Sequence, residues 1–247
     1  MTDWKLSKSV PELTAGEVHI WRIRLDISDD DWQALTSMLS DDEQIKAKRF
    51  HYEKHRRRYI VGRAALRTLL GQYLDLQPKS IEFTYNSHGK PGLADGSSGM
   101  RFNLSHTEEI MLAAFVMGSD IGIDIESIMR DVDCTDIGQR WFSDMEGRTL
   151  QALPDYARHD AFFRTWSRKE AYIKARGEGI SHLLHRFSVS VDEHEPRLIE
   201  HQDDAGETIR WRFIDIDAGE KYRATVVVES ADWKLRLHSL CRPPFQS

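Results

Sequence analysis

The chain has 247 residues, 40% hydrophobic and 30% charged, and its 40 acidic and 34 basic residues give a formal net charge of −6. This is the composition of a soluble globular protein of one or two domains, and it excludes a fibrous or disordered chain. The longest apolar run, residues 110–117, is too short to span a membrane, the N-terminus lacks the apolar stretch of a secretion signal, and two cysteines make no disulfide framework. We therefore expect a cytoplasmic protein that does not bind membranes.

The first half of the chain mixes strands with a long amphipathic helix. In chain order the patterns predict a strand at 18–25, a helix opened by Ser28 and ending near 39, helices at 41–50 and 55–74, a strand at 81–85, a loop at 86–99, and strands at 102–104 and 111–116. Ser105, His106 and Thr107 are expected between the last two strands.

The second half has a similar order of elements. The patterns predict a strand at 121–126, helices at 136–141, 144–153 and 160–176, and strands at 187–191, 209–215, 222–228 and 233–240. We predict an α+β fold of two similar α/β subdomains, residues 1–118 and 119–247, each a small antiparallel sheet packed on helices.

Positive charge is concentrated in residues 46–67, which contain nine basic residues and the single acid Glu53. A basic helix in an acidic protein favours a local anion site over a nucleic-acid surface. A solvated charged face is the alternative. His51 and His55 have the spacing of a pair of metal ligands. The three arginines at residues 56–58 would repel a cation there.

The sharpest motif is IGIDIE, residues 121–126. On a strand, Asp124 and Glu126 share the face opposite the isoleucines, and paired carboxylates suit a hard divalent cation. Gly122 would leave room beside them. The alternative is a half-exposed strand with two solvated acids.

A second motif, WSRKEAYIK, covers residues 166–174 on a predicted helix. Glu170 and Lys174 are one turn apart and share a face. They form either an ordinary surface ion pair or a third metal carboxylate beside a lysine that binds phosphate.

The third motif is FNLSH, residues 102–106. The Ser105 hydroxyl and the His106 imidazole at a strand end can bind phosphate oxygens. A Ser–His nucleophile pair and a structural histidine are the alternatives. The chain has neither a Walker A sequence nor a Gly-x-Gly-x-x-Gly fingerprint.

Together with GKP at residues 89–91, these motifs resemble, in order and spacing, those of the 4'-phosphopantetheinyl transferases of the long, surfactin-synthetase-activating (Sfp) type. The resemblance covers roughly residues 40–190. It implies a monomer of two similar halves, with coenzyme A between them as co-substrate. It also implies transfer of the phosphopantetheine arm to a serine of an apo acyl or peptidyl carrier protein, with release of 3',5'-ADP.

By motif position the resemblance also assigns site residues. It implies that Mg²⁺, or Mn²⁺, is held by Asp124, Glu126 and Glu170. Lys174 would bind the pyrophosphate with Lys169 nearby, and Glu146 matches the family's proposed general base. The remaining contacts to coenzyme A would come from Lys46, Arg58, Ser105 and His106 at the phosphates and from Lys90 near the nucleotide.

One position departs from the family pattern. Glu43 stands where the family often has a lysine that contacts the 3'-phosphate, so Lys46 would carry more of that role. Two other functions use the same residues. A metal-dependent phosphohydrolase would need no carrier protein, and a nucleic-acid-binding module centred on residues 46–67 would not need Asp124. The motifs favour the transferase, with no nucleic-acid partner, and leave the carrier proteins and the base open.

Overall fold

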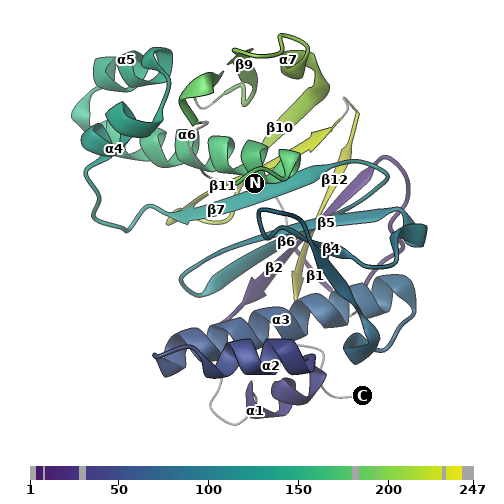
Figure 1. The fold of residues 1–247 in the computed structure, drawn as a ribbon. Coiled ribbons are helices and arrows are strands. Elements are labelled where there is room, and N and C mark those ends of the chain that lie inside the picture. The colour runs from purple at the N-terminus through teal and green to yellow at the C-terminus, as the bar shows by residue number, and fades with distance from the viewer. Residues whose placement is uncertain are drawn as a thin grey trace.

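A computed structural model describes residues 4–7, 9–27, 32–179, 184–192, 194–229 and 232–240. Two sheets lie face to face between a long helix on each outer side, α3 (Glu53–Leu74) and α6 (Asp155–Arg176) (Figure 1). This arrangement confirms the predicted α+β class with small sheets packed on helices. Within the described residues, no helix is both long and apolar enough to cross a membrane.

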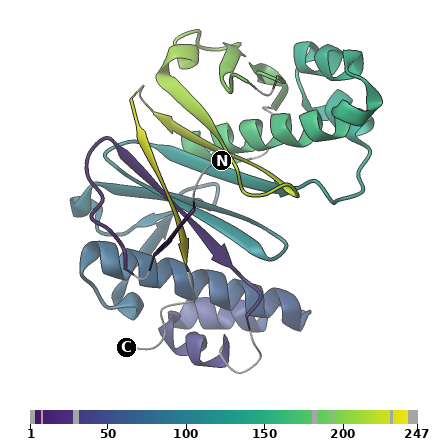
Figure 2. The same cartoon turned by 180° about the vertical axis from the view of Figure 1, so that it is seen from behind.

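The first sheet has five strands. Their spatial order is β1 (Lys5–Ser7), β12 (Lys234–Leu240), β2 (Glu17–Arg24), β6 (Ile110–Met117) and β5 (Met100–Thr107). The pairs β2–β6 and β6–β5 are antiparallel, whereas β12 runs parallel to both β1 and β2 (Figure 2). The last strand therefore returns to the sheet of the N-terminal part. The first sheet is therefore not purely antiparallel, as was predicted. The predicted boundary between residues 118 and 119 does not divide the two sheets, because β12 belongs to the first.

The second sheet has three antiparallel strands. Their order is β10 (Trp211–Ile216), β11 (Tyr222–Glu229) and β7 (Ile121–Ser127). Shorter elements surround the two sheets, namely α1 (Trp32–Leu35), α2 (Asp41–Lys48), α4 (Cys134–Trp141), α5 (Asp144–Ala152), α7 (Glu207–Arg210), and the strand pairs β3 (Phe83–Tyr85) with β4 (Pro91–Leu93) and β8 (Phe187–Val189) with β9 (Leu198–His201).

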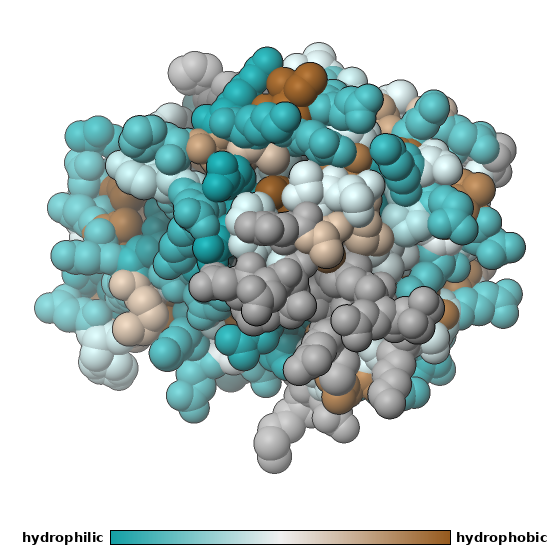
Figure 3. All heavy atoms as spheres, turned by 90° about the horizontal axis from the view of Figure 1, so that it is seen from below, coloured by the Kyte–Doolittle hydropathy of each residue, from teal (hydrophilic) through white to brown (hydrophobic). Residues whose placement is uncertain are grey.

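The core between the sheets is built from alternate residues of both. The buried side chains include Val18, Ile20, Leu112, Ala114 and Val116 from the first sheet and Ile121, Ile123, Ile125, Val226 and Val228 from the second. The other face of each sheet packs on its long helix, so β6 and β7 are buried on both faces. The face seen from below in Figure 1 is mostly hydrophilic, with scattered apolar side chains (Figure 3).

Several predicted boundaries differ from the structure. The helix expected to open at Ser28 is described only as α1 and a 3₁₀ turn over Thr36–Met38, and Ser28 lies outside the described residues. The strand expected from Ile209 begins at Trp211 because residues 207–210 form α7. There the buried Glu207 carboxylate accepts hydrogen bonds from Trp211 Nε1 and Tyr172 Oη, which hold the turn in place.

Candidate functional site

The two sheets meet along one edge of each, where β5 lies beside β7. Ser105 and His106 are inside β5, opposite Leu112 and Met111 of β6, and do not follow a strand end as expected. The hairpin turns at Glu108, whose φ of 46° is left-handed. Because adjacent strand residues point to opposite faces, Ser105 faces β7 while His106 faces α3. They therefore cannot act as a nucleophile pair.

Polar side chains of β5 join the open edge of β7. Asn103 Oδ1 accepts a hydrogen bond of 2.9 Å from the backbone N–H of Ile123. Ser105 Oγ donates to Asp124 Oδ1 at 2.9 Å. An edge strand leaves alternate backbone groups without a partner strand, and Asn103 satisfies one of them. Asn103 belongs to the FNLSH motif, but strand periodicity alone assigned it no role.

The acid cluster is defined here as Asp124, Glu126 and Glu170, with Lys174 beside it. Lys174 Nζ lies 2.6 Å from Asp124 Oδ1 and 2.9 Å from Ser105 Oγ. Asp124 and Glu170 are buried, with exposed fractions of 2% and 4%. The structure thus brings together Ser105 and Lys174 with the acids that the motifs predicted.

Gly122 makes this contact between β7 and α6 possible. A Cβ atom there would lie 2.1 Å from the carbonyl oxygen of Ala171 and 2.2 Å from the amide nitrogen of Ala175. The space over Gly122 itself is therefore filled by the backbone of α6, and is not left open as the sequence suggested. The acids of β7 lie against the helix that carries Glu170.

Burial and mutual repulsion raise the pKa of two carboxyl groups of the acid cluster, Glu170 and Glu126. Desolvation, followed by the charge of Asp124, raises the pKa of Glu170 to about 7, and Lys174 only partly offsets this. The same two causes raise the pKa of Glu126, against the opposing charge of Arg130. Carboxylates whose charges are opposed in this way are stabilised by a cation.

The donor atoms of the acid cluster fit a divalent cation. Asp124 Oδ2 and Glu170 Oε1 are buried and have no hydrogen-bond partner among the described residues. Within the same residues, no three His, Cys, Asp or Glu side chains already converge as a metal-binding group. Asp124 instead contacts Lys174, and Glu126 accepts a hydrogen bond of 2.9 Å from Arg130. Buried carboxylate oxygens that lack donors are the ligands that Mg²⁺ prefers.

A cavity of about 720 Å³ lies on the opposite face of β5, against α3. Its polar lining includes the predicted Lys46, Arg58 and His106 and two more residues of the basic helix, His55 and Arg63. It also includes Tyr85 and Arg130, which the sequence did not single out. Partial desolvation and then the Lys174 charge lower the pKa of the His106 ring. Arg130 both lines the cavity and contacts Glu126, so the cavity adjoins the acid cluster.

Glu43 lies away from this cavity and joins α2 to α3. It is 2% exposed, and its carboxylate accepts hydrogen bonds from Arg63 Nε at 2.9 Å and Arg67 Nε at 2.7 Å. Arg67 also donates to the carbonyl oxygens of Pro78 and Ile81. The residue that departs from the family pattern thus forms a buried ionic contact between helices.

The structure does not place Glu146 and Lys169 where the resemblance implied. Both are fully buried, and Lys169 Nζ lies 2.8 and 2.7 Å from the two Glu146 carboxylate oxygens. Those oxygens also accept hydrogen bonds from the amides of Ser143 and Val189. A carboxylate with both oxygens occupied and no solvent access cannot take a proton from a substrate serine. This ion pair fastens α5 to α6.

Lys90, which was expected near the nucleotide, makes its contacts with protein groups. It does not line the cavity that contains Lys46 and Arg58; instead its ammonium donates to the carbonyl oxygens of Ile121 and Ala175. Burial lowers the pKa of Lys90 to about 8. Its contacts are thus with β7 and α6.

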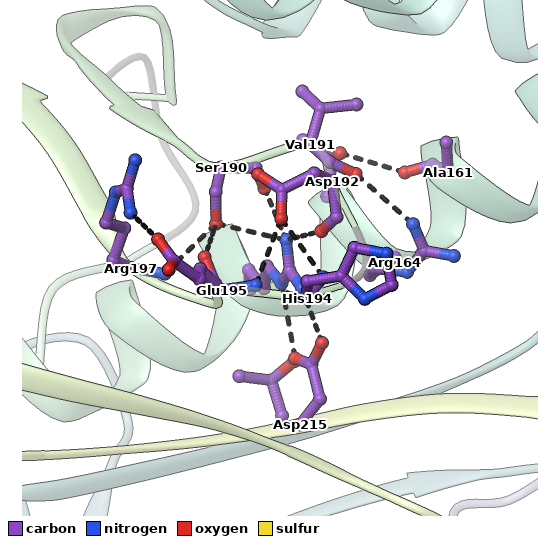
Figure 4. Close-up of polar contacts among 12 residues, drawn as sticks. Ala161, Arg164, Ser190, Val191, Asp192, His194, Glu195, Arg197 and Asp215 are labelled. Atoms are coloured by element: carbon purple, nitrogen blue, oxygen red, sulfur yellow. Dashed lines mark hydrogen bonds and ion pairs between the residues drawn. The ribbon is translucent and has the colours of Figure 1, made fainter. Parts of the chain in front are cut away.

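The rest of the WSRKE segment anchors α6. Arg168 is fully buried and donates to the carbonyl oxygens of Ser190 and Asp192, both at 2.6 Å, and to the carboxylate of Asp215. Figure 4 shows the polar contacts around Ser190 and Asp192, with Asp215 below them in this view. Within residues 167–170, then, only Glu170 belongs to the acid cluster.

Comparison with known proteins identifies the family. Residues 120–227 match the 4'-phosphopantetheinyl transferase superfamily, and residues 25–117 match the 4'-phosphopantetheinyl transferase N-terminal family. The chain is 37% identical over 228 residues to the 4'-phosphopantetheinyl transferase HetI of Nostoc sp., covering 91% of this chain and 93% of that protein. The chain belongs to the 4'-phosphopantetheinyl transferase family. The resemblance seen in the motifs is thereby confirmed, and the chain is an enzyme of this family.

Other relatives agree with this membership. The chain is 30% identical over 167 residues to the 4'-phosphopantetheinyl transferase Sfp of Bacillus subtilis, covering 68% of this chain and 73% of Sfp. Among solved structures, the holo-[acyl-carrier-protein] synthase of Thermotoga maritima aligns with 45% of this chain and 62% of its own, with a TM-score of 0.36 and 19% identity.

Proposed function

We propose that this enzyme transfers the 4'-phosphopantetheine arm of coenzyme A to a serine hydroxyl of an apo acyl or peptidyl carrier protein, releasing 3',5'-ADP. The observation that carries the proposal is the basic cavity beside the acid cluster, where Asp124 and Glu170 each have an unpartnered buried oxygen. The family membership of the chain supports the same reaction. We expect the enzyme to act as a cytoplasmic monomer.

The cavity supplies the charge that coenzyme A needs. Lys46, Arg58 and His106 face it from α2, α3 and β5, so phosphate groups can be bound from three sides. Charge-assisted hydrogen bonds from such groups are about twice as strong as neutral ones. A substrate seated there can extend past Arg130 toward the acid cluster, where the pyrophosphate would lie.

The acid cluster would hold a divalent cation. Asp124, Glu170 and Glu126 would be its protein ligands, and Glu126 would exchange its hydrogen bond with Arg130 for this contact. Bound Mg²⁺ or Mn²⁺ would supply positive charge next to the pyrophosphate. Lys174 lies between Ser105 and Asp124, so its ammonium is placed to hold a phosphoryl oxygen as charge develops on the leaving 3',5'-ADP.

The proton of the attacking serine requires a base at the acid cluster. In the reaction, the serine oxygen forms a bond to the phosphorus of the phosphopantetheine group while the bond from that phosphorus to 3',5'-ADP breaks. Glu170 would be a ligand of the cation, whose charge lowers the pKa of a carboxylate that holds it, so Glu170 is not assigned as the base. Water beside the cation would take the serine proton. Glu146, which the sequence suggested for this role, is enclosed by Lys169 and two amides.

The test is intact mass measurement of several apo carrier proteins after incubation with the enzyme, coenzyme A and Mg²⁺. The expected result is a gain of one phosphopantetheine unit and release of 3',5'-ADP. Unmodified carriers with coenzyme A hydrolysed in water would instead make the enzyme a phosphohydrolase. A panel of acyl and peptidyl carriers would show which assembly lines it serves.

The metal assignment is tested with Asp124→Asn, which keeps the shape of the side chain. We expect transfer to fall about a hundredfold or more, because charge stabilisation by a metal is worth several kcal/mol. Asp120→Asn is the matched control, since Asp120 is exposed and directly precedes β7. Similar rates for the two variants at limiting Mg²⁺ would contradict the assignment.

A further inference from the structure

The loop of residues 86–90 lies against the C-terminal end of α6. Asn86 Nδ2 donates to the carbonyl oxygen of Gly177 at 2.7 Å, and Lys90 Nζ donates to that of Ala175 at 3.1 Å. Asn86 Oδ1 orders the loop by accepting hydrogen bonds from the amides of His88 and Lys90, both at 2.9 Å. Carbonyl groups in the last turn of a helix lack partners within the helix, and a cation there is favoured by the helix dipole.

The residues after α6 fit closely against this loop. Gly177 has a φ of 71°, and a Cβ atom there would lie 3.0 Å from Asn86 Nδ2. At Gly179 a Cβ atom would lie 2.9 Å from His88 Nδ1. The loop therefore meets the helix end along a surface that side chains at these two positions would obstruct.

Lys90 also reaches the open edge of β7. Its ammonium lies 3.0 Å from the carbonyl oxygen of Ile121, on the edge where Asn103 accepts the amide of Ile123. One side chain is thus bonded to both elements that carry the acid cluster. Ile121 is three residues before Asp124 on β7, and Ala175 directly follows Lys174 on α6.

We propose that Lys90 is a positioning residue, which holds β7 and α6 in the register that brings Asp124 beside Glu170 and Lys174. At Gly122 the two elements meet backbone to backbone, and Ser167 and Lys174 of α6 both bond to Asp124. Lys90 adds a tie from a third element, at the end of the contact where Ile121 and Ala175 lie. The role differs from a contact to the nucleotide. It rests on the proposed function, because the register matters for a bound divalent cation.

The test compares Lys90→Met with Arg101→Met. Arg101 is exposed and lines the same cavity of about 240 Å³ as Lys90, so its loss removes a nearby charge without removing the bonds to β7 and α6. Mn²⁺ binding is measured by electron paramagnetic resonance without substrate, and the transfer rate is measured against coenzyme A concentration. For Lys90→Met we expect about tenfold weaker Mn²⁺ binding and about tenfold lower kcat, with the KM for coenzyme A within twofold of wild type, because residues that orient metal ligands typically contribute about 10- to 100-fold. Arg101→Met should match wild type.

A raised KM for coenzyme A with unchanged Mn²⁺ affinity and kcat would overturn the proposal and make Lys90 a nucleotide contact. A lower melting temperature with unchanged Mn²⁺ affinity would also overturn it, because Lys90 would then serve stability alone. Should Lys90→Met not fold, Lys90→Gln retains one donor and is measured in its place. If neither Lys90→Met nor Lys90→Gln folds, Lys90 is required for folding itself, and the positioning proposal is likewise overturned.

The wild-type protein separates this proposal from the proposed function. Absence of transfer by wild type, with Mn²⁺ binding that still depends on Lys90, contradicts the transferase reaction but supports the positioning role. Normal transfer by wild type with unaffected Mn²⁺ binding and kcat in Lys90→Met contradicts the positioning role alone.

Discussion

Arg58 carries a paired charge at the wall of the basic cavity. Its guanidinium donates to both carboxylate oxygens of Asp26, at 2.8 and 2.9 Å. This bidentate contact fixes the guanidinium plane at the wall, and it leaves donor hydrogens for a phosphate. Arg63 also lines the cavity, and Glu43 and Tyr85 occupy the same two of its nitrogens, Nε and Nη2. Hydrogen bonding therefore does not separate the two arginines, and Arg58 is the one to test because the motif resemblance implies it at the phosphates.

We predict that Arg58→Gln raises the KM for coenzyme A by roughly ten- to a hundredfold, the worth of a charge-assisted hydrogen bond. Dephospho-coenzyme A, which lacks the 3'-phosphate, should be affected much less. Steady-state kinetics with both substrates measure the difference. Asp26→Asn is the control, since it removes the partner and keeps the guanidinium. Equal losses with both substrates would assign Arg58 a structural or pyrophosphate role.

The buried pair of Glu146 and Lys169 leads to a prediction about stability. Glu146→Gln leaves the Lys169 ammonium without a counter-charge in a site with no solvent access, which should lower the free energy of unfolding by about 3–5 kcal/mol. The double variant Glu146→Gln with Lys169→Met should recover part of this loss. Urea denaturation measures both. The folded fraction of Glu146→Gln should keep nearly normal kcat, whereas a fall of about 10²- to 10⁴-fold would restore Glu146 as the base.

At the scale of elements, the contact between β7 and α6 depends on the absence of one side chain. All residues of α6 from Ser167 to Ile173 are buried, although the segment includes Arg168, Lys169 and Glu170. The helix is accommodated because each charged group has a specific partner on a surrounding element, or belongs to the acid cluster. Close approach at Gly122 is what brings that cluster together.

We predict that Gly122→Ala lowers the free energy of unfolding by at least about 3 kcal/mol, since the new methyl group would overlap backbone atoms that cannot rotate away. Transfer should be lost in any folded fraction because α6 must move. Gly147→Ala is the matched control. It lies on α5 with no atom within 4 Å of its added Cβ, and it should gain about 0.5–1 kcal/mol. Thermal unfolding of the two variants in parallel decides the matter, and equal melting temperatures would refute the argument.

At the scale of the whole molecule, β12 joins the two ends of the chain within one sheet. Its His238 ring stacks on Trp21 of β2, with centroids 4.7 Å apart, and His238 Nδ1 lies 3.0 Å from Ser7 Oγ of β1. His238 Nε2 is buried and has no hydrogen-bond partner among the described residues. Desolvation, followed by repulsion from His19, lowers the pKa of His238 to about 4.

This depressed pKa predicts acid sensitivity of the fold. The unfolded chain binds a proton at His238 near the ordinary value of 6.5, whereas the folded chain does so only near 4. The stabilisation is therefore complete above about pH 6.5 and is lost as the pH falls toward 4. Lys5, Arg236 and His19 oppose the charged ring, while Glu17 favours it. His238 is buried, but its charged neighbours Lys5 and Arg236 are exposed, so after solvent screening we expect an effect of about 1 kcal/mol.

His238→Phe keeps the stacked ring and removes the titrating group. Its melting temperature should fall less steeply than that of wild type between pH 6.5 and 4.5. Parallel slopes for the two proteins would show that His238 does not contribute to the acid response.

The sequence by itself predicted the residues that gather at the acid cluster. Asp124, Glu170, Lys174 and Ser105 were predicted from motifs, and the structure brings them together. The long helices and, apart from β1, the strands of both sheets were also predicted, because apolar periodicity reflects which face of an element is buried. Motifs and apolar periodicity are both local patterns, so they can be recognised without knowledge of the fold.

Only the tertiary structure showed which groups Lys90, Glu146 and Lys169 contact. Periodicity does not say which element a charged residue of a loop or short helix meets, and Lys90 precedes β4 while Glu146 lies on α5. Lys169 lies in the part of α6 where every residue from Ser167 to Ile173 is buried, so no face marks its direction. The parallel pairing of β12 with β2 was equally hidden, because Leu237 lies opposite Ile20 in the sheet although the two residues are 217 positions apart in the sequence. Contacts between segments so distant along the chain depend on how the two halves pack, which no local pattern records.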